Sequence, residues 1–247
     1  MKKILILAMT VILSAGAFAQ REVTKFLGIP VDGTKQSMIQ KLKAKGFTYN
    51  QQTDYLYGEF NGEKVRISVQ TQGNKVWRLA IIDEIGRNEN QIRIRFNNLV
   101  SQFENNDKYT SLKDSQTLSD NEDISYEIYA NDKQYEAIFY QSSKDATEFT
   151  NSLLTIQKEY KERYAKELKQ IEEYLSQFSE EQLENPTVEM EENSKKISDW
   201  SAKNTMEMIT DLLYRKVVWF TIGRNYGKYY ITMFYENNYN KADGSDL

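Results

Sequence analysis

Apolar and polar residues alternate along two neighbouring segments, 55–60 and 64–69, and a mostly apolar third segment follows, a pattern that predicts three β-strands. Two-residue turns of Asn61-Gly62 and Gly73-Asn74 separate the segments, and Asn-Gly is the strongest short signal for a hairpin. The third segment is VWRLAII at 76–82. The apolar side of the first two strands consists of Leu56, Gly58, Phe60, Val65, Ile67 and Val69. We therefore expect an antiparallel meander.

Amphipathic helices with recognisable ends flank this meander. Thr34 is placed as the N-cap of a helix over KQSMIQKLKAK, and Gly46 follows where a left-handed residue ends a helix. Asn88 and Gln91 are spaced as a capping box at the start of a second helix. The apolar stripe of that helix is Ile92, Phe96, Leu99 and Phe103.

The order of elements predicts an α+β protein with antiparallel sheets. With short strands at 24–28 and 47–50, residues 20–106 form a β-α-β4-α unit. Residues 107–247 form a second antiparallel region of four strands. These strands have alternating patterns at 123–129, 135–139, 218–222 and 229–235.

A long helical insertion is expected at about 145–213, between the two hairpins of the second region. Apolar residues recur every three or four positions along 146–178, which predicts an amphipathic helix of about nine turns. The acidic stretch 184–196 is expected to be a loop, and a second helix to cover 197–213. Its partner residues would be Trp200, Met208 and Leu212, in an antiparallel helical hairpin. The alternative partner is a second copy of the chain, in a homodimer through helix 146–178.

The first 19 residues are typical of a cleavable signal peptide. Lys2 and Lys3 precede an apolar run of about ten residues, and Ala17-Phe18-Ala19 gives the small-x-small pattern of a cleavage site. Cleavage would leave Gln20 as the new N-terminus. The sequence contains no cysteine, so a lipid anchor at the cleavage site is excluded. We therefore expect a periplasmic or secreted protein that is not a lipoprotein.

The amino-acid composition excludes several kinds of catalytic site, metal site and partner. The chain has neither histidine nor cysteine, which excludes Ser-His-Asp and Cys-His catalysis and removes the ligands that zinc, copper and iron prefer. Without Lys2 and Lys3, 30 basic residues face 36 acidic ones, a net charge of −6. That balance argues against nucleic acid as a partner. No later segment is long and apolar enough for a membrane span. We expect no cofactor and no metal site.

Two stretches resemble a family of uncharacterised secreted proteins of gut anaerobic bacteria. They are FLGIPVDGT with KLKAKGF, at 26–34 and 41–47, and VWFTIGRNYGKYYITMFYENNYNKADGSDL, at 218–247. The resemblance implies export and a similar length, but no activity and no site residues. The β-α-β4-α order also looks like the fold of the TATA-box-binding protein and of protein inhibitors of β-lactamase. That analogy concerns the fold alone.

The leading candidate for a binding site is an aromatic sheet face. Its expected members are Tyr129, Tyr140, Trp219, Tyr230 and Phe234. Flat rings with polar tips can bind sugars, peptides or another protein. The alternative is that helices of the insertion cover this face and the rings are core residues.

Three other candidates carry weaker signals. GRNYGK at 223–228 lacks the spacing of a phosphate-binding loop and fits a hairpin turn. Glu127 and Glu136, on expected paired strands, are the most plausible pair of carboxylates for glycoside hydrolysis. The tail offers oxygen ligands for calcium at Asn240, Asp243, Ser245 and Asp246, but does not match an EF-hand loop.

Together these features favour a non-catalytic binding or interaction protein. The alternative is a carboxylate-dependent hydrolase acting on glycans, which would need two acids within about 5–10 Å in a cleft. A third hypothesis is an assembly role in the cell envelope, in which the long helix pairs with another helix.

Overall fold

A computed structural model describes residues 23–141 and 146–241 of the 247-residue chain. They form two compact units, which we call the sheet unit (23–141 and 214–241) and the helical unit (146–213). The expected signal peptide, with its cleavage site, and the tail residues from Asp243 onward lie outside the described residues. Within the described ranges, no helix has the length and apolarity required to cross a membrane.

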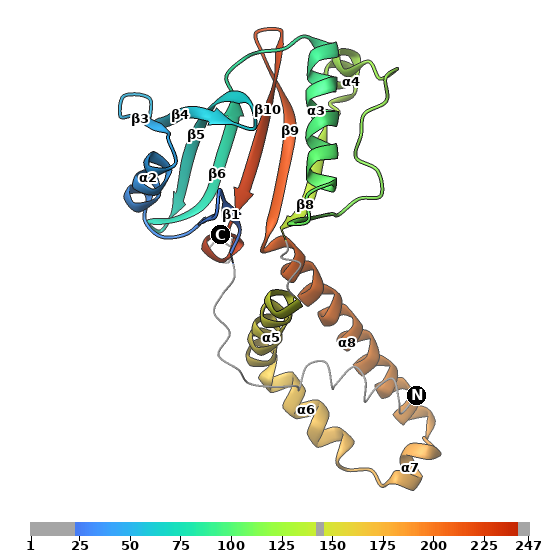
Figure 1. The fold of residues 1–247 in the computed structure, drawn as a ribbon. Helices are drawn as coiled ribbons and strands as arrows, with labels where there is room; N and C mark the ends of the chain where they lie inside the picture. Colours follow the sequence, from blue (N-terminus) through green and yellow to red (C-terminus); the bar gives the residue numbers. More distant parts are fainter. Residues whose placement is uncertain (1–22, 142–145, 242–247) are drawn as a thin grey trace. The chain divides into compact units, whose positions relative to one another are not determined.

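The sheet unit is built on one eight-stranded antiparallel sheet (Figure 1). Its strands lie in the order β3-β4-β5-β6-β10-β9-β8-β7. Their bounds are β3 Thr48–Asn50, β4 Tyr55–Phe60, β5 Glu63–Gln72, β6 Lys75–Asp83, β7 Tyr109–Ser111, β8 Glu136–Gln141, β9 Val217–Asn225 and β10 Lys228–Glu236. The predicted α+β class with antiparallel pairing is confirmed. Because β6 pairs with β10, the two expected sheet regions are continuous, and the boundary expected near residue 106 lies inside one unit.

Local turn and cap chemistry accounts for the first half of the sheet unit. Asn61 and Gly62 both have positive φ, at 55° and 74°, as a tight hairpin between β4 and β5 requires. Thr34 caps α2 (Lys35–Ala44) by accepting a hydrogen bond from the Ser37 amide. Gly46, with φ 98°, ends that helix, as predicted. The expected strand at 24–28 is a small hairpin of β1 (Lys25–Phe26) and β2 (Ile29–Pro30).

Three helices cover one face of the sheet. They are α2, α3 (Glu89–Glu104) and α4 (Ile124–Asn131), and each contributes to a single hydrophobic core (Figure 1). The capping box predicted for α3 at Asn88 and Gln91 is present. The largest fully buried side chains of this core include Phe26, Phe96, Phe139, Phe220, Met38, Leu42, Leu56, Ile67, Leu79, Ile81, Ile92 and Leu99.

The strand predicted at 123–129 is wrong, because this segment is the helix α4. Ile124 and Ile128 alternate with polar residues, but they are also four residues apart and so lie on one side of a helix. Ile124 is buried in the core and Ile128 packs against it. The Asp123 side chain caps the helix by accepting a hydrogen bond of 2.8 Å from the Tyr126 amide. The short segment fits the two-residue period of a strand and the helical spacing equally well, so side-chain capping and tertiary contacts decide that it is a helix.

The helical unit contains four helices in an antiparallel hairpin. These are α5 Ala146–Arg163, α6 Ala165–Leu175, α7 Glu180–Glu184 and α8 Val188–Tyr214, the last residue of which belongs to the sheet unit. The small core of the hairpin is Ile156, Tyr160, Met208 and Leu212, with Leu153 and Tyr164 packed against it. Tyr164 also meets Trp200 edge to face at 5.6 Å. Burial, with the nearby carboxylates of Asp211 and Glu207, raises the pKa of the Tyr160 hydroxyl.

Two predictions for the insertion need correction. The expected single helix over 146–178 is interrupted at Tyr164, whose φ of −106° and ψ of 22° lie outside the helical values, and α6 ends at Leu175. The expected loop at 184–196 is helical from Val188 onward. Acidic residues in a first turn favour a helix through its dipole, and Thr187 accepts a hydrogen bond from the Met190 amide. High charge was therefore a poor reason to predict a loop.

A close contact at Gly58 gives a test of the sheet unit's packing. A Cβ atom at Gly58 would lie 2.6 Å from Cδ1 of Phe47, which is itself buried. We expect Gly58→Ala to lower the free energy of unfolding by about 1–3 kcal/mol, because the core must shift to accept it. Chemical denaturation measures this change. The matched control is Gly223→Ala on β9, where a Cβ meets nothing within 4 Å and φ is not positive, so stability should be unchanged or slightly raised. Equal effects at the two positions would contradict the packing described here.

Candidate functional site

The second face of the sheet carries the candidate site. Side chains alternate along each strand, so the residues between the buried ones point away from α2, α3 and α4. We call this surface the open face. In the sheet unit as described, no helix packs its core residues against it. Its residues include Tyr55, Tyr57, Arg66, Ser68, Arg78, Ala80, Ile82, Ile138, Tyr140, Trp219, Thr221, Tyr230, Thr232, Phe234 and Glu236.

Strand register arranges the open face in rows that run across the sheet. The central row is Ser68, Ala80, Phe234, Trp219 and Ile138, each directly opposite the next. The row on one side is Tyr57, Arg66, Ile82, Thr232, Thr221 and Glu136. On the other side Arg78 lies opposite both Gln70 and Glu236. Aromatic rings therefore lie beside hydroxyl, amide and charged groups.

Trp219 and Phe234 form a stacked pair at the centre of the open face. Their ring centroids are 4.2 Å apart, and the planes are inclined by 24°. The guanidinium carbon of Arg78 lies 4.9 Å from the Phe234 centroid and 4.1 Å from that of Trp77, distances typical of cation–π contacts. Trp219 and Phe234 are both half-buried, so part of each ring remains accessible. The contacts fix these rings in place and leave a rigid aromatic surface.

A buried carboxylate holds the stacked pair in position. Glu236 is nearly inaccessible. Its Oε1 forms an ion pair with Arg78 at 2.5 Å and accepts a hydrogen bond from Trp219 Nε1 at 3.0 Å. The indole N–H of Trp219 is thereby satisfied within the protein, so the ring offers a ligand its apolar surface. Glu236 is thus a positioning residue for the rings.

The structure separates the five residues that the sequence analysis grouped together. Tyr140, Trp219, Tyr230 and Phe234 do share the open face, because their strands pair in register. Tyr140 is only 5% exposed, and the hydroxyl of Tyr230 lies against Gly86. Tyr129 lies on α4 and is 84% exposed, because its segment is helical. Its expected place on the sheet is therefore wrong.

Sequence reasoning missed Arg78 and Glu236. Arg78 interrupts the apolar segment VWRLAII, and an isolated arginine in a mostly apolar strand was the available signal. A charge there has to be paired if it is buried. Its partner could not be named, because the pairing of β6 with β10 joins residues far apart in the sequence.

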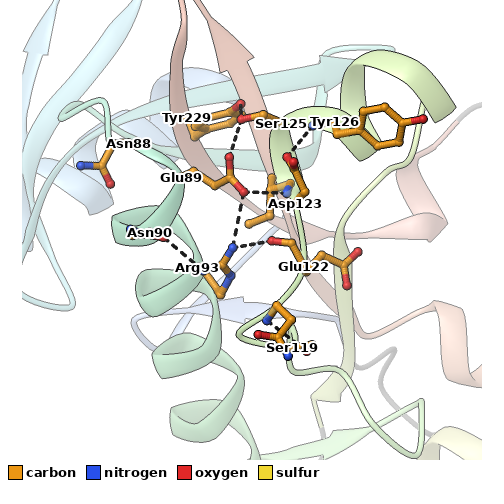
Figure 2. A network of polar contacts seen from close by, with 12 residues as sticks. Asn88, Glu89, Asn90, Arg93, Ser119, Glu122, Asp123, Ser125, Tyr126 and Tyr229 are labelled. Carbon is orange, nitrogen blue, oxygen red and sulfur yellow. Dashed lines mark hydrogen bonds and ion pairs between the residues drawn. The ribbon is translucent and has the colours of Figure 1, made fainter.

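A second polar cluster lies where α3 meets α4. Figure 2 shows Glu89 directed toward Ser125, with Tyr229 beyond the serine hydroxyl. The Ser125 hydroxyl lies 2.5 Å from Glu89 Oε2 and 2.7 Å from the Tyr229 hydroxyl. Because an ionised carboxylate only accepts, Ser125 donates to Glu89 and Tyr229 donates to Ser125.

The contacts of this cluster indicate an anchor for α4. Glu89 Oε1 also accepts from the Ile124 amide at 2.8 Å, so one carboxylate holds both the first amide and the second side chain of the helix (Figure 2). Arg93 donates to the Glu122 carbonyl on the approach to α4. A hydrogen bond from Lys133 holds the pKa of the Glu122 carboxyl below its usual range. Each group is engaged by the protein, and the cluster stabilises a helix end.

The remaining candidates are not supported as sites. Glu127 lies on α4 and Glu136 on β8, so the expected pairing of these carboxylates on neighbouring strands is wrong. GRNYGK contains the turn between β9 and β10, with positive φ at Tyr226 and Gly227. Asn240 donates hydrogen bonds to Asp32 and to the Val76 carbonyl. Across residues 23–141 and 146–241, no cluster of three or more carboxylates could hold a metal ion.

Comparisons with known proteins add no relatives. No family model, no curated protein and no solved structure matches the chain. The resemblance to secreted proteins of gut anaerobic bacteria, and the analogy with the TATA-box-binding protein fold, therefore stay predictions.

Proposed function

We propose that this chain is an exported, non-catalytic binding module that takes a glycan on the open face. The observation that carries the proposal is the stacked pair of Trp219 and Phe234, half-buried and fixed by Arg78 and Glu236. Sugar rings have apolar C–H faces that pack on flat aromatic side chains. Rigid rings bind with little loss of conformational freedom.

Side chains around the rings suit the hydroxyl groups of a sugar. Thr221 and Thr232 lie opposite each other in the row beside the stacked pair, and Ser68 lies in the same row as the rings. Hydroxyl groups can both donate and accept, so they can match sugar hydroxyls in either orientation. This mixture of apolar and hydrogen-bonding groups supports glycan binding.

The edges of the sheet give little support to peptide binding by strand addition. The outermost strands, β3 and β7, have three residues each. Short edge strands offer few free backbone groups, and proteins use them to prevent pairing with other chains. The face of the sheet is thus a better candidate than its edge.

The proposed location follows from the first 19 residues, whose pattern is typical of a signal peptide. A periplasmic or extracellular protein meets polysaccharides of the envelope and of the medium. Location and proposed ligand therefore agree.

Affinity electrophoresis through gels that contain soluble polysaccharides tests the proposal. The panel should include neutral and acidic polymers. We expect retardation of the wild type by at least one polymer, and a loss of roughly tenfold or more in affinity for Trp219→Ala, as for a central aromatic contact. Tyr129→Ala is the matched control, because this exposed aromatic lies on α4. Thermal melting of each variant separates lost binding from lost folding.

Two results would count against this function. The first is the absence of retardation by every polymer of the panel. The second is equal retardation of a folded Trp219→Ala variant and the wild type, because the stacked pair would then play no part in binding.

A further inference from the structure

Arg66 differs from the other arginines of β5, β6, the following turn and α3. Arg78, Arg87, Arg93 and Arg95 each have a carboxylate partner, at distances from 2.5 to 3.4 Å. Arg66 has none among the described residues. Its Nε, like those of Arg78 and Arg93, is buried without a hydrogen-bond partner. The side chain is half-buried on the open face. A guanidinium in such surroundings attracts an acceptor with negative charge.

Two tyrosines fix the surroundings of Arg66. Its guanidinium carbon lies 5.3 Å from the centroid of Tyr55, and Tyr57 is directly opposite on β4. The rings of Tyr55 and Tyr57 meet edge to face at 6.4 Å. On the other side Arg66 faces Ile82 of β6, and Ser68 follows on the same face of β5. The group is therefore held beside aromatic rings and carries an unused capacity to donate.

Arg66 lies within reach of a ligand on the stacked pair. Phe234 is two strands away and in the next row, which places the two Cα atoms roughly 12 Å apart from standard sheet spacings. A short oligosaccharide can bridge that distance. In the next row Glu59 lies directly opposite Lys64, which balances its charge. Glu136, at the far end of the row that contains Arg66, is four strands away, roughly 19 Å. The surroundings of Arg66 thus favour an anionic group.

We propose that Arg66 is a carboxylate-binding residue and that the ligand of the open face is an acidic glycan, with uronic acid residues. Arg66 would receive one carboxylate, in the bidentate arrangement that guanidinium groups favour, while a neighbouring sugar ring packs on Trp219 and Phe234. This inference rests on the proposed glycan-binding function and names its ligand class.

The test compares polymers that differ only in charge. Polygalacturonate and hyaluronate are each paired with their own methyl esters, and poly-L-glutamate supplies carboxylates without sugar. Binding to the full chain is followed by affinity electrophoresis at fixed ionic strength. We expect the wild type to bind at least one acidic glycan about tenfold or more tightly than its ester, since charged hydrogen bonds are the stronger ones. Arg66→Met should remove this preference and keep the affinity for the ester.

Matched variants keep the outcomes distinct. Arg224→Met removes an exposed arginine from the β9–β10 hairpin and should leave the preference intact. Equal binding of acid and ester, with no effect of Arg66→Met, would overturn the role of Arg66 but leave glycan binding standing. If poly-L-glutamate binds as tightly as the acidic glycan, the proposal that the ligand is a glycan would be overturned. If no glycan, acidic or esterified, binds the wild type, both the glycan-binding function and the role of Arg66 would be overturned. If Arg66→Met folds poorly, Arg66→Lys replaces it, because lysine keeps the charge but cannot form the bidentate contact. An unchanged preference of Arg66→Lys for the acidic glycan over its methyl ester would contradict the proposed geometry.

Discussion

Replacing Arg78 with alanine should lower the free energy of unfolding by about 3–5 kcal/mol, the usual cost of breaking a buried ion pair from one side. The side chain of Glu236 is 8% exposed, and Arg78 is its cationic partner at 2.5 Å. Without that partner, the carboxylate keeps the Trp219 N–H as its donor at 3.0 Å. The substitution also removes the cation–π contacts with Phe234 and Trp77. Denaturant titration followed by tryptophan fluorescence measures the effect.

A double-mutant cycle separates the ion pair from the packing. Glu236→Gln removes the charge but keeps the shape, and Arg78→Met keeps most of the side-chain volume. If the pair is coupled as the distances indicate, the double variant should be more stable than the sum of the single effects predicts, by about 1–3 kcal/mol. Additive effects would mean that Arg78 contributes through ring contacts alone.

Replacing Met208 with aspartate should destabilise the helical unit by about 4 kcal/mol or more, because it buries an unpaired charge. Met208 is 2% exposed and packs with Ile156, Tyr160 and Leu212. Met206, two residues earlier on α8, is 63% exposed. Met206→Asp is therefore the matched control and should change stability by less than about 1 kcal/mol. Hydrogen exchange of the α5 and α8 amides reports on the helical unit directly.

Sedimentation of the same variants tests the alternative of a homodimer through 146–178. If the apolar stripe of α5 packs within one chain, Met208→Asp loosens the unit whatever the protein concentration. A variant that remains fully protected from exchange but changes from dimer to monomer would show that the stripe packs between two copies. That result would contradict the hairpin described here.

The elements that could be predicted from the sequence are those whose signals are local. Asn61-Gly62 specifies its hairpin, and Asn88 with Gln91 specifies the start of α3, since the interacting groups lie within three residues. Alternation in 55–69 identified the first two strands of the meander because one face is buried. Periodicity over many turns likewise predicted the helices of the insertion.

Predictions failed where the deciding contacts are distant in the sequence. Residues 124–131 satisfy both a strand and a helix pattern, and Glu89, 35 residues earlier, holds the end of the helix. The register of β6 with β10 joins Arg78 to Glu236 across more than 150 residues, so no local pattern could bring the pair together. Trp219 and Phe234 could be placed on one face by alternation, but their stacking depends on the register of β9 with β10, which places the two residues directly opposite each other.

The order of strands in the sheet also determines when the protein can fold. β9 and β10 lie between the β3–β6 meander and the β7–β8 pair, yet they come last in sequence among the described strands. Until residues 217–236 are present, the meander and the β7–β8 pair are separate pieces, each with its pairing edge uncovered. Within the sheet unit, the Gln141 amide donates a hydrogen bond of 2.8 Å to the Lys216 carbonyl, so the end of β8 also gains this partner only once the chain has reached β9. Folding of the sheet is therefore a late event in the synthesis of this chain, completed by its C-terminal hairpin.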